Sequence, residues 1–128
     1  MSAHLILLVD DEPFITSIMK RKLVDRGHDV IVASDGEEAL QLARTEQPHA
    51  IVTDLQMPHI SGLELAVALR RLPETASTPI ILLTGRGHYV NAEIIPRTNI
   101  CQIISKPFSA REIVRAVETL LEVNKEAA

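Results

Sequence analysis

Five short apolar runs occur along the sequence, separated by longer stretches in which apolar residues recur at helical spacing. Uniformly apolar runs are typical of strands that are buried on both faces, as in a parallel sheet covered by helices. The runs comprise residues 5–9, 30–33, 50–53, 80–83 and 103–104. The pattern therefore predicts five parallel strands that alternate with helices.

Helix start and stop signals lie between these runs. Phe14 opens a first amphipathic stretch, and Gly27 is expected to cap its C-terminus. A second helix is predicted over Gly36–Glu46. Ser61 is expected to cap a third helix, and Ser109 begins a capping box with Glu112 for the last one.

The stretch between the fourth and fifth strands carries a weaker helical pattern. Gly85 and Gly87 come before it, and Pro96 lies where the middle or last turn of a helix would be. Proline removes a backbone donor and clashes with the preceding turn of a helix. A fourth helix within residues 85–99 is therefore expected to be short or bent.

This alternation predicts a doubly wound α/β fold with right-handed crossovers. The expected arrangement is flavodoxin-like, (βα)5, with five parallel strands in the order 2-1-3-4-5. Residues 1–128 are expected to form a single domain. Ligands of such folds bind beyond the carboxyl ends of the strands.

Composition limits the possible partners and compartments. The chain carries 13 basic and 17 acidic residues, a net charge of −4, so no direct binding of nucleic acid by this domain is expected. The apolar run at residues 5–9 is too short for a signal peptide or a membrane span. The single cysteine, Cys101, excludes an intrachain disulfide and is expected to be an inert buried thiol. A cytoplasmic protein without a membrane segment is the expectation.

Polar residues follow four of the five predicted strands. Asp10, Asp11 and Glu12 come after the first strand, and Asp54 ends the third. Carboxylates gathered at one sheet edge repel one another unless a cation neutralises them. Mg²⁺ takes oxygen ligands of this kind and usually keeps several waters. The sequence therefore predicts a Mg²⁺ site in which Asp10 and Asp11 are ligands.

The same edge carries the groups needed for phosphoryl transfer. An aspartate carboxylate can attack phosphorus and form an aspartyl phosphate. The phosphoryl oxygens then need positive charge and hydrogen-bond donors. Lys106 follows the fifth strand and Thr84 ends the fourth, whereas Asp54 is the lone carboxylate on the middle strand. We assign Asp54 as the nucleophile, with Lys106 and Thr84 as partners of the phosphoryl group.

Four motifs in this order resemble the receiver domain of two-component response regulators. They are "ILLVDDEP", "IVTDLQMPHISG", "PIILLTG" and "ISKPFS", which together span nearly the whole chain. The resemblance implies that Asp54 accepts a phosphoryl group from a histidine kinase or a histidine phosphotransfer protein. It also implies that Lys106 and Thr84 contact this group, and that a cis peptide joins Lys106 to Pro107.

The resemblance further implies a set of ligands for Mg²⁺. Asp11, Asp54 and the backbone carbonyl of Gln56 would bind the ion directly, and Asp10 would act through water. Catalysis would be limited to self-catalysed phosphotransfer and autodephosphorylation, so the chain is expected to be a signalling domain rather than an enzyme.

Three positions depart from the usual receiver pattern. Ile103 stands where receivers usually carry an aromatic switch residue, and Asn99 and Ile100 replace a Gly-Ala pair. Gln56 and Arg86 occupy the positions that influence the lifetime of the phosphoryl group. Because Ile103 cannot act as an aromatic switch, we expect phosphorylation to reorder residues 85–99 instead. The surface that they form with the fifth strand and the last helix would then dock a partner or a second copy.

Two other protein classes fit these residues less well, and a third interpretation stays open. An aspartate-nucleophile phosphatase of the haloacid dehalogenase type needs a second Asp two residues after the nucleophile, where Gln56 stands. An FMN-binding flavodoxin needs a hydroxyl- and glycine-rich loop after the first strand. A receiver fold that docks partners without phosphate stays open, and so do the kinase, the output and the length of the full protein. The five histidines are expected to be surface residues.

Overall fold

The computed structural model describes residues 4–85 and 90–127, and the side chains of residues 4–85 and 90–122. Strands and helices alternate along the first half of the chain, as the sequence predicts. The elements are β1 (Leu5–Val9), α1 (Pro13–Asp25), β2 (Asp29–Ala33), α2 (Gly36–Glu46), β3 (Ala50–Asp54), α3 (Gly62–Arg71), β4 (Ile80–Thr84), the 3-10 helix η1 (Ile95–Arg97), β5 (Ile100–Ser105) and α4 (Ala110–Ala127).

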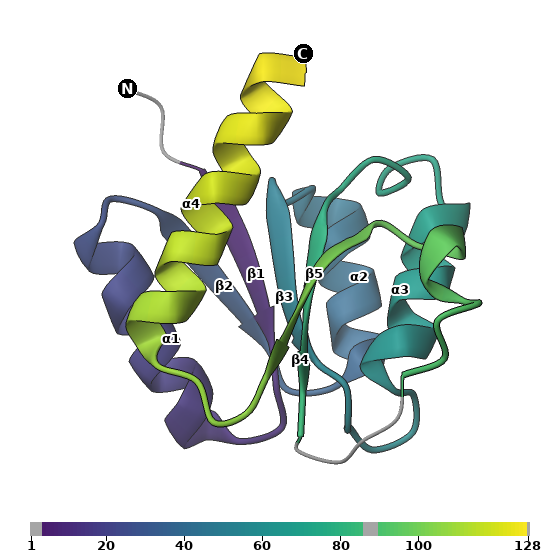
Figure 1. The fold of residues 1–128 in the computed structure, drawn as a ribbon, viewed down its shortest axis with the longest axis horizontal. Coiled ribbons are helices and arrows are strands. Elements are labelled where there is room, and N and C mark those ends of the chain that lie inside the picture. Colours follow the sequence, from purple (N-terminus) through teal and green to yellow (C-terminus); the bar gives the residue numbers. More distant parts are fainter. Residues whose placement is uncertain (1–3, 86–89, 128) are drawn as a thin grey trace.

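The five strands form one parallel sheet in the order β2-β1-β3-β4-β5. Figure 1 shows α1 and α4 on one face of this sheet and α2 and α3 on the other. Val9 at the end of β1 pairs with Ala33 of β2 and with Thr53 of β3. The carboxyl ends of these strands are therefore level, which confirms the predicted flavodoxin-like fold and strand order.

Two aliphatic layers hold the helices to the sheet. Ile6, Leu8 and Val52 point toward α1 and α4, whereas Leu7 and Ile51 point toward α2 and α3. All five side chains are at most 1% exposed. Each contributes roughly 2 kcal/mol of burial free energy, so the sheet is anchored on both faces and holds its carboxyl edge rigidly.

Serine side chains cap the start of α3 and of α4, as the sequence predicts. The Ser61 hydroxyl accepts a hydrogen bond from the Glu64 amide at 3.1 Å, and the Glu64 carboxylate accepts one from the Ser61 amide at 3.0 Å. The Ser109 hydroxyl accepts from the Glu112 amide at 3.1 Å. Past the end of α1, Gly27 has φ +91°, a conformation that glycine adopts without steric strain.

The predicted fourth helix is wrong for the described part of residues 85–99. Residues 85 and 90–99 contain turns and η1 but no α-helix, and residues 86–89, with Arg86, lie outside the described residues. The Asn99 side-chain amide donates to the carbonyls of Thr75 and Ala76 at 3.2 and 2.8 Å. Arg70 Nη1 donates to the Thr98 carbonyl at 3.0 Å. The end of the segment is thus tied to α3 and the loop after it, and Pro96 further disfavours helix.

β5 is longer than the predicted run and leaves Cys101 exposed, so the prediction of a buried thiol is also wrong. β5 is an edge strand, paired with β4 alone, and its register shifts where Ile80 and Ile81 pair with it. Such an irregularity leaves the extra residue of the bulged strand unpaired. Ile103, farther along β5, is 42% exposed. No helix in the described residues is long and apolar enough to cross a membrane.

Three histidines gather at the amino ends of the strands, opposite the carboxyl edge. The ring centroid of His4 lies 6.1 Å from that of His28 and 5.1 Å from that of His49. The prediction of a surface position is wrong for His28, which is largely buried. Its side chain is 11% exposed, and its Nε2 lies 3.0 Å from Oε2 of Glu118. His49 Nδ1 accepts a hydrogen bond from the Leu5 amide.

Candidate functional site at the carboxyl edge of the sheet

The residues assigned to phosphoryl chemistry meet at the carboxyl edge of the sheet. Asp54 is the last residue of β3, Thr84 is the last residue of β4, and Lys106 directly follows β5. Asp10 directly follows β1, between Val9 and the start of α1. A hollow of about 390 Å³ opens here, lined by Asp11, Glu12, Asp54, Gln56, Met57, Pro58 and Lys106.

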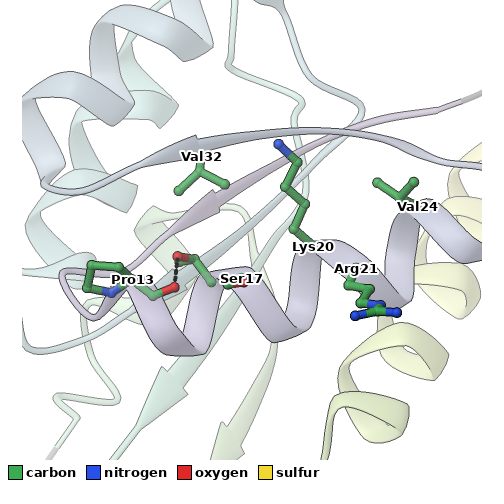
Figure 2. A pocket seen from close by; sticks show the side chains of 7 residues that line it. Pro13, Ser17, Lys20, Arg21, Val24 and Val32 are labelled. Atoms are coloured by element: carbon green, nitrogen blue, oxygen red, sulfur yellow. Dashed lines mark hydrogen bonds between the residues drawn. The ribbon is translucent and has the colours of Figure 1, made fainter.

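A second hollow of about 390 Å³ lies away from this edge, between α1 and the edge strand β2. Figure 2 shows Lys20 reaching from α1 toward β2, while Val32 points from β2 toward α1. The residues that line this second hollow include the cations Lys20 and Arg21 but no carboxylate. Of these two hollows, only the first is lined by carboxylates.

Asp54 and Lys106 form an ion pair inside the first hollow. Oδ1 of Asp54 lies 3.2 Å from Nζ of Lys106, and their side chains are 6% and 32% exposed. Burial raises the pKa of Asp54, and the neighbouring Lys106 ammonium opposes that rise. For Lys106, burial lowers the pKa, but attraction to Asp54 outweighs it, so the pKa is raised overall. Near neutral pH, Lys106 is thus a firmly held cation beside the carboxylate.

Asp10 is also buried, and only one of its two carboxylate oxygens has a hydrogen-bond partner among the described residues. Its Oδ1 accepts a hydrogen bond from the Glu12 amide at 2.9 Å, whereas Oδ2 is buried without a hydrogen-bond partner among the described residues. Burial raises the pKa of Asp10 to about 6, with a smaller rise from the charge of Asp54. An unpaired buried carboxylate oxygen needs a cation or a water, so Asp10 fits a cation site.

Asp10, Asp11 and Glu12 present carboxylate oxygens that all lie within 4.8 Å of one another. Three hard oxygen donors this close suit a divalent ion such as Mg²⁺. The residues present therefore fit the cation that the receiver resemblance implies. Glu12 joins this group, although the sequence predicts only Asp10 and Asp11 of these three as ligands. Its position directly after two aspartates was the available signal, but the direction of its side chain depends on the turn into α1.

The loop after Asp54 is held close to the strand that carries the carboxylate. The Leu55 amide donates to the Leu83 carbonyl, and the Gly62 amide donates to the Leu55 carbonyl, both at 2.8 Å. A Cβ atom on Gly62 would overlap the backbone carbonyl of Asp54. The tight approach at Gly62 therefore fixes the backbone of Asp54 relative to α3.

Thr84 and Pro107 also lie at this edge, at the end of β4 and just after β5. The Thr84 hydroxyl lies 3.5 Å from Oγ of Ser105, a long hydrogen bond, so it is only loosely held. The peptide bond between Lys106 and Pro107 is cis, which confirms the expectation from the receiver resemblance.

Comparison with protein families matches residues 6–118 to the response regulator receiver domain. The alkaline phosphatase synthesis transcriptional regulatory protein PhoP of Bacillus subtilis is 37% identical over 123 residues, which are 96% of this chain and 50% of PhoP. The transcriptional regulatory protein CpxR of Escherichia coli is 37% identical over 116 residues, which are 91% of this chain and 48% of CpxR. The chain thus spans about half the length of these relatives.

Solved structures of receiver domains share the fold. The receiver domain of the Francisella response regulator 1452 is 32% identical with a TM-score of 0.83, over 94% of this chain and 98% of that one. The receiver domain of the sensor histidine kinase PA1611 of Pseudomonas aeruginosa is 25% identical with a TM-score of 0.83, over 94% of this chain and 99% of that one. That structure has a magnesium ion coordinated in its active-site cleft. From the family match and these relatives, the chain belongs to the response regulator receiver domains, a family of signalling domains.

Proposed function

We propose that Asp54 is the phosphoacceptor of this receiver domain. The observation that carries the proposal is the buried Asp54 carboxylate, 3.2 Å from Lys106 Nζ, at the mouth of an open hollow. A carboxylate oxygen attacks the phosphorus of a phosphohistidine, an O–P bond forms, the N–P bond breaks, and the imidazole leaving group takes a proton from solvent. The donor is a histidine kinase or a histidine phosphotransfer protein.

Lys106 and Thr84 stabilise the transferred group in this proposal. The ammonium of Lys106 shifts from the carboxylate to a phosphoryl oxygen, and the loosely held hydroxyl of Thr84 turns toward another. Both changes place donors on charge that develops during transfer. Mg²⁺, when bound, would supply further positive charge. As the receiver resemblance implies, Asp11, Asp54 and the backbone carbonyl of Gln56 would hold it directly, and Asp10 through water. Arg86 and Gln56 are proposed to set the lifetime of the phosphoryl group.

The output surface is proposed to consist of the η1 segment, β5 and α4. Ile103 lies on this surface, 42% exposed, and a branched aliphatic side chain cannot act as a rotating aromatic switch. Instead, movement of Thr84 toward the phosphoryl group would shift the residues that follow β4. These residues would then be the element that switches between two arrangements. A partner protein, an output domain or a second copy of the chain would dock there. The exposed thiol of Cys101 suits a reducing compartment, the cytoplasm.

Intact-mass analysis tests acceptor chemistry directly. With Mg²⁺ and acetyl phosphate, the wild-type protein should gain one phosphoryl group that is lost rapidly at alkaline pH. The Asp54→Asn variant should gain none. Equal labelling of this variant would move the acceptor to another residue and remove the basis of the proposal.

A further inference from the structure

The strand β2 leaves one edge of the sheet open. It lies at the end of the strand order and, among the described strands, pairs with β1 alone. The Asp29 amide and the Ala33 carbonyl both bond to residues that flank β1. Because alternate residues of a strand direct their N–H and C=O groups to opposite sides, Val30 and Val32 present theirs at the open edge.

The second hollow, between α1 and β2, lies beside this open edge. Figure 2 shows Lys20 reaching from α1 toward β2 and Val32 pointing from β2 toward α1. Pro13 and Val24 of α1 add apolar surface to the hollow, and Ser17 adds a hydroxyl group. An extended peptide placed next to β2 would follow its pleat, so alternate side chains of the peptide would face this hollow.

The second hollow is basic although the chain as a whole is acidic. Residues 20–26 include four basic side chains and one acidic one, whereas the net charge of the chain is −4. Among the described residues, Arg26 is paired with Glu118, but neither Lys20 nor Arg21 has a carboxylate within ion-pair distance. Two cations without a partner at an open strand edge complement an acidic polypeptide.

Other occupants fit the hollow less well. A second copy of the chain, pairing β2 with β2 about a two-fold axis, would bring the same basic side chains face to face, and Lys20 and Arg21 would repel their counterparts. A nucleic acid would meet the cations, but it has no backbone amides and carbonyls that could pair with Val30 and Val32. An acidic polypeptide complements both features.

We propose that the open edge of β2 and the hollow beside α1 bind an acidic, extended segment of a partner protein, which joins the sheet as an added strand. Main-chain hydrogen bonds to Val30 and Val32 attach the segment, and its carboxylates pair with Lys20 and Arg21. This docking site goes beyond the phosphoacceptor chemistry and does not depend on Asp54.

Fluorescence anisotropy at pH 7 tests the proposal. The probe is a fluorescein-labelled peptide of alternating valine and glutamate, and the control peptide alternates valine with lysine. Lys20→Glu reverses one charge in the hollow. Lys22→Glu is the matched control, because Lys22 is exposed on the same helix, does not line the hollow, and changes the net charge by the same amount. Thermal melts confirm that both variants are folded.

We expect the wild-type protein to bind the glutamate peptide more tightly than the lysine peptide. Lys20→Glu should raise the Kd for the glutamate peptide by about fivefold or more, and Lys22→Glu should raise it much less. Equal rises in the two variants would assign the effect to general charge and overturn the proposal. Equal binding of the two peptides, or no binding of the glutamate peptide, would overturn it as well.

Amide hydrogen exchange, followed by NMR at saturating glutamate peptide, tests the addition of a strand. The amides of Val30 and Val32 should exchange more slowly in the complex. The Asp29 amide should change little, because it already donates to the His4 carbonyl. Unchanged exchange at Val30 and Val32 would overturn the proposal and would mean that Lys20 shields the edge from other strands rather than recruiting one.

Discussion

Lys106 Nζ lies 3.2 Å from Asp54 Oδ1, although the two residues come from the ends of different strands. The pairing offsets much of the cost of burying a carboxylate at the end of β3. In the proposed function, the same carboxylate exchanges the ammonium for a phosphoryl group. The ion pair thus links the stability of the resting site to its chemistry.

Replacing Lys106 should affect both properties. Lys106→Met leaves the Asp54 carboxylate buried without its cation, so we expect a loss of roughly 1–3 kcal/mol in unfolding free energy at pH 7. The pKa of Asp54 should rise further, and the loss should therefore shrink as the pH falls and Asp54 becomes protonated. Urea denaturation at pH 7 and pH 4.5 measures both effects. Lys106→Arg, which keeps the charge, is the control; equal losses in the two variants would contradict the electrostatic explanation.

The pH dependence of metal-free stability should carry the signature of Asp10. Burial raises its pKa from 3.8 to about 6, so the folded state holds this proton more tightly than the unfolded chain does. The contribution of Asp10 to stability is therefore greatest below pH 3.8 and is lost as the pH rises through about 6. By pH 7 the difference reaches roughly 3 kcal/mol.

Asp10→Asn isolates this contribution. In the presence of EDTA, the variant should be more stable than wild type at pH 7, and its advantage should decline toward pH 4. Saturating Mg²⁺ should reduce or reverse the advantage, because the ion stabilises only the site that retains the carboxylate. A difference in stability between Asp10→Asn and wild type that stays constant from pH 4 to pH 7 would mean that Asp10 does not titrate as proposed.

The close approach at Gly62 predicts a loss of both stability and labelling. A Cβ at Gly62 would overlap the Asp54 carbonyl, whereas a Cβ at Gly27 would meet no atom within 4 Å. Gly27→Ala should cost only about 1 kcal/mol of backbone strain, since φ at Gly27 is +91°. Gly62→Ala should cost about 2 kcal/mol or more, and it should also slow phosphorylation by acetyl phosphate because the backbone of Asp54 must shift. Equal effects of the two substitutions would show that the contact is unimportant.

His59 provides a test in the opposite direction. It lies in the loop between β3 and α3 with φ +72°, a conformation that side chains with a Cβ rarely adopt. His59→Gly should relieve this strain and raise the unfolding free energy by about 0.5–1 kcal/mol. Thermal denaturation measures the change, and a loss of stability would show that the imidazole makes a compensating contact.

The sequence predicted the features that depend on local pattern. Uniformly apolar runs gave the strands, Ser61 and Ser109 gave helix starts, and strand ends brought Asp54 and Lys106 to one edge. The prediction of a fourth helix was wrong because the segment is tied to distant residues by hydrogen bonds from Arg70 and from the Asn99 side chain. No local pattern indicates such bonds.

Two further features depended on tertiary geometry. The exposure of Cys101 follows from the position of β5 at the edge of the sheet and from its shifted register. Glu12 lines the hollow because of the turn between β1 and α1. The sequence alone does not indicate this, since a residue at the N-cap position often caps the helix instead. Residue type and spacing indicated the chemistry of the edge but not the direction of each side chain.

Chemical mapping of the phosphorylated residue tests the central claim most directly. Borohydride reduces an aspartyl phosphate to homoserine and releases phosphate, so the acceptor is marked by a stable change in one peptide. After treatment with Mg²⁺ and acetyl phosphate, peptide mass spectrometry should find homoserine at position 54. Homoserine at Asp10 or Asp11 instead, or at no position in a protein that remains folded, would contradict the assignment of Asp54 as the phosphoacceptor.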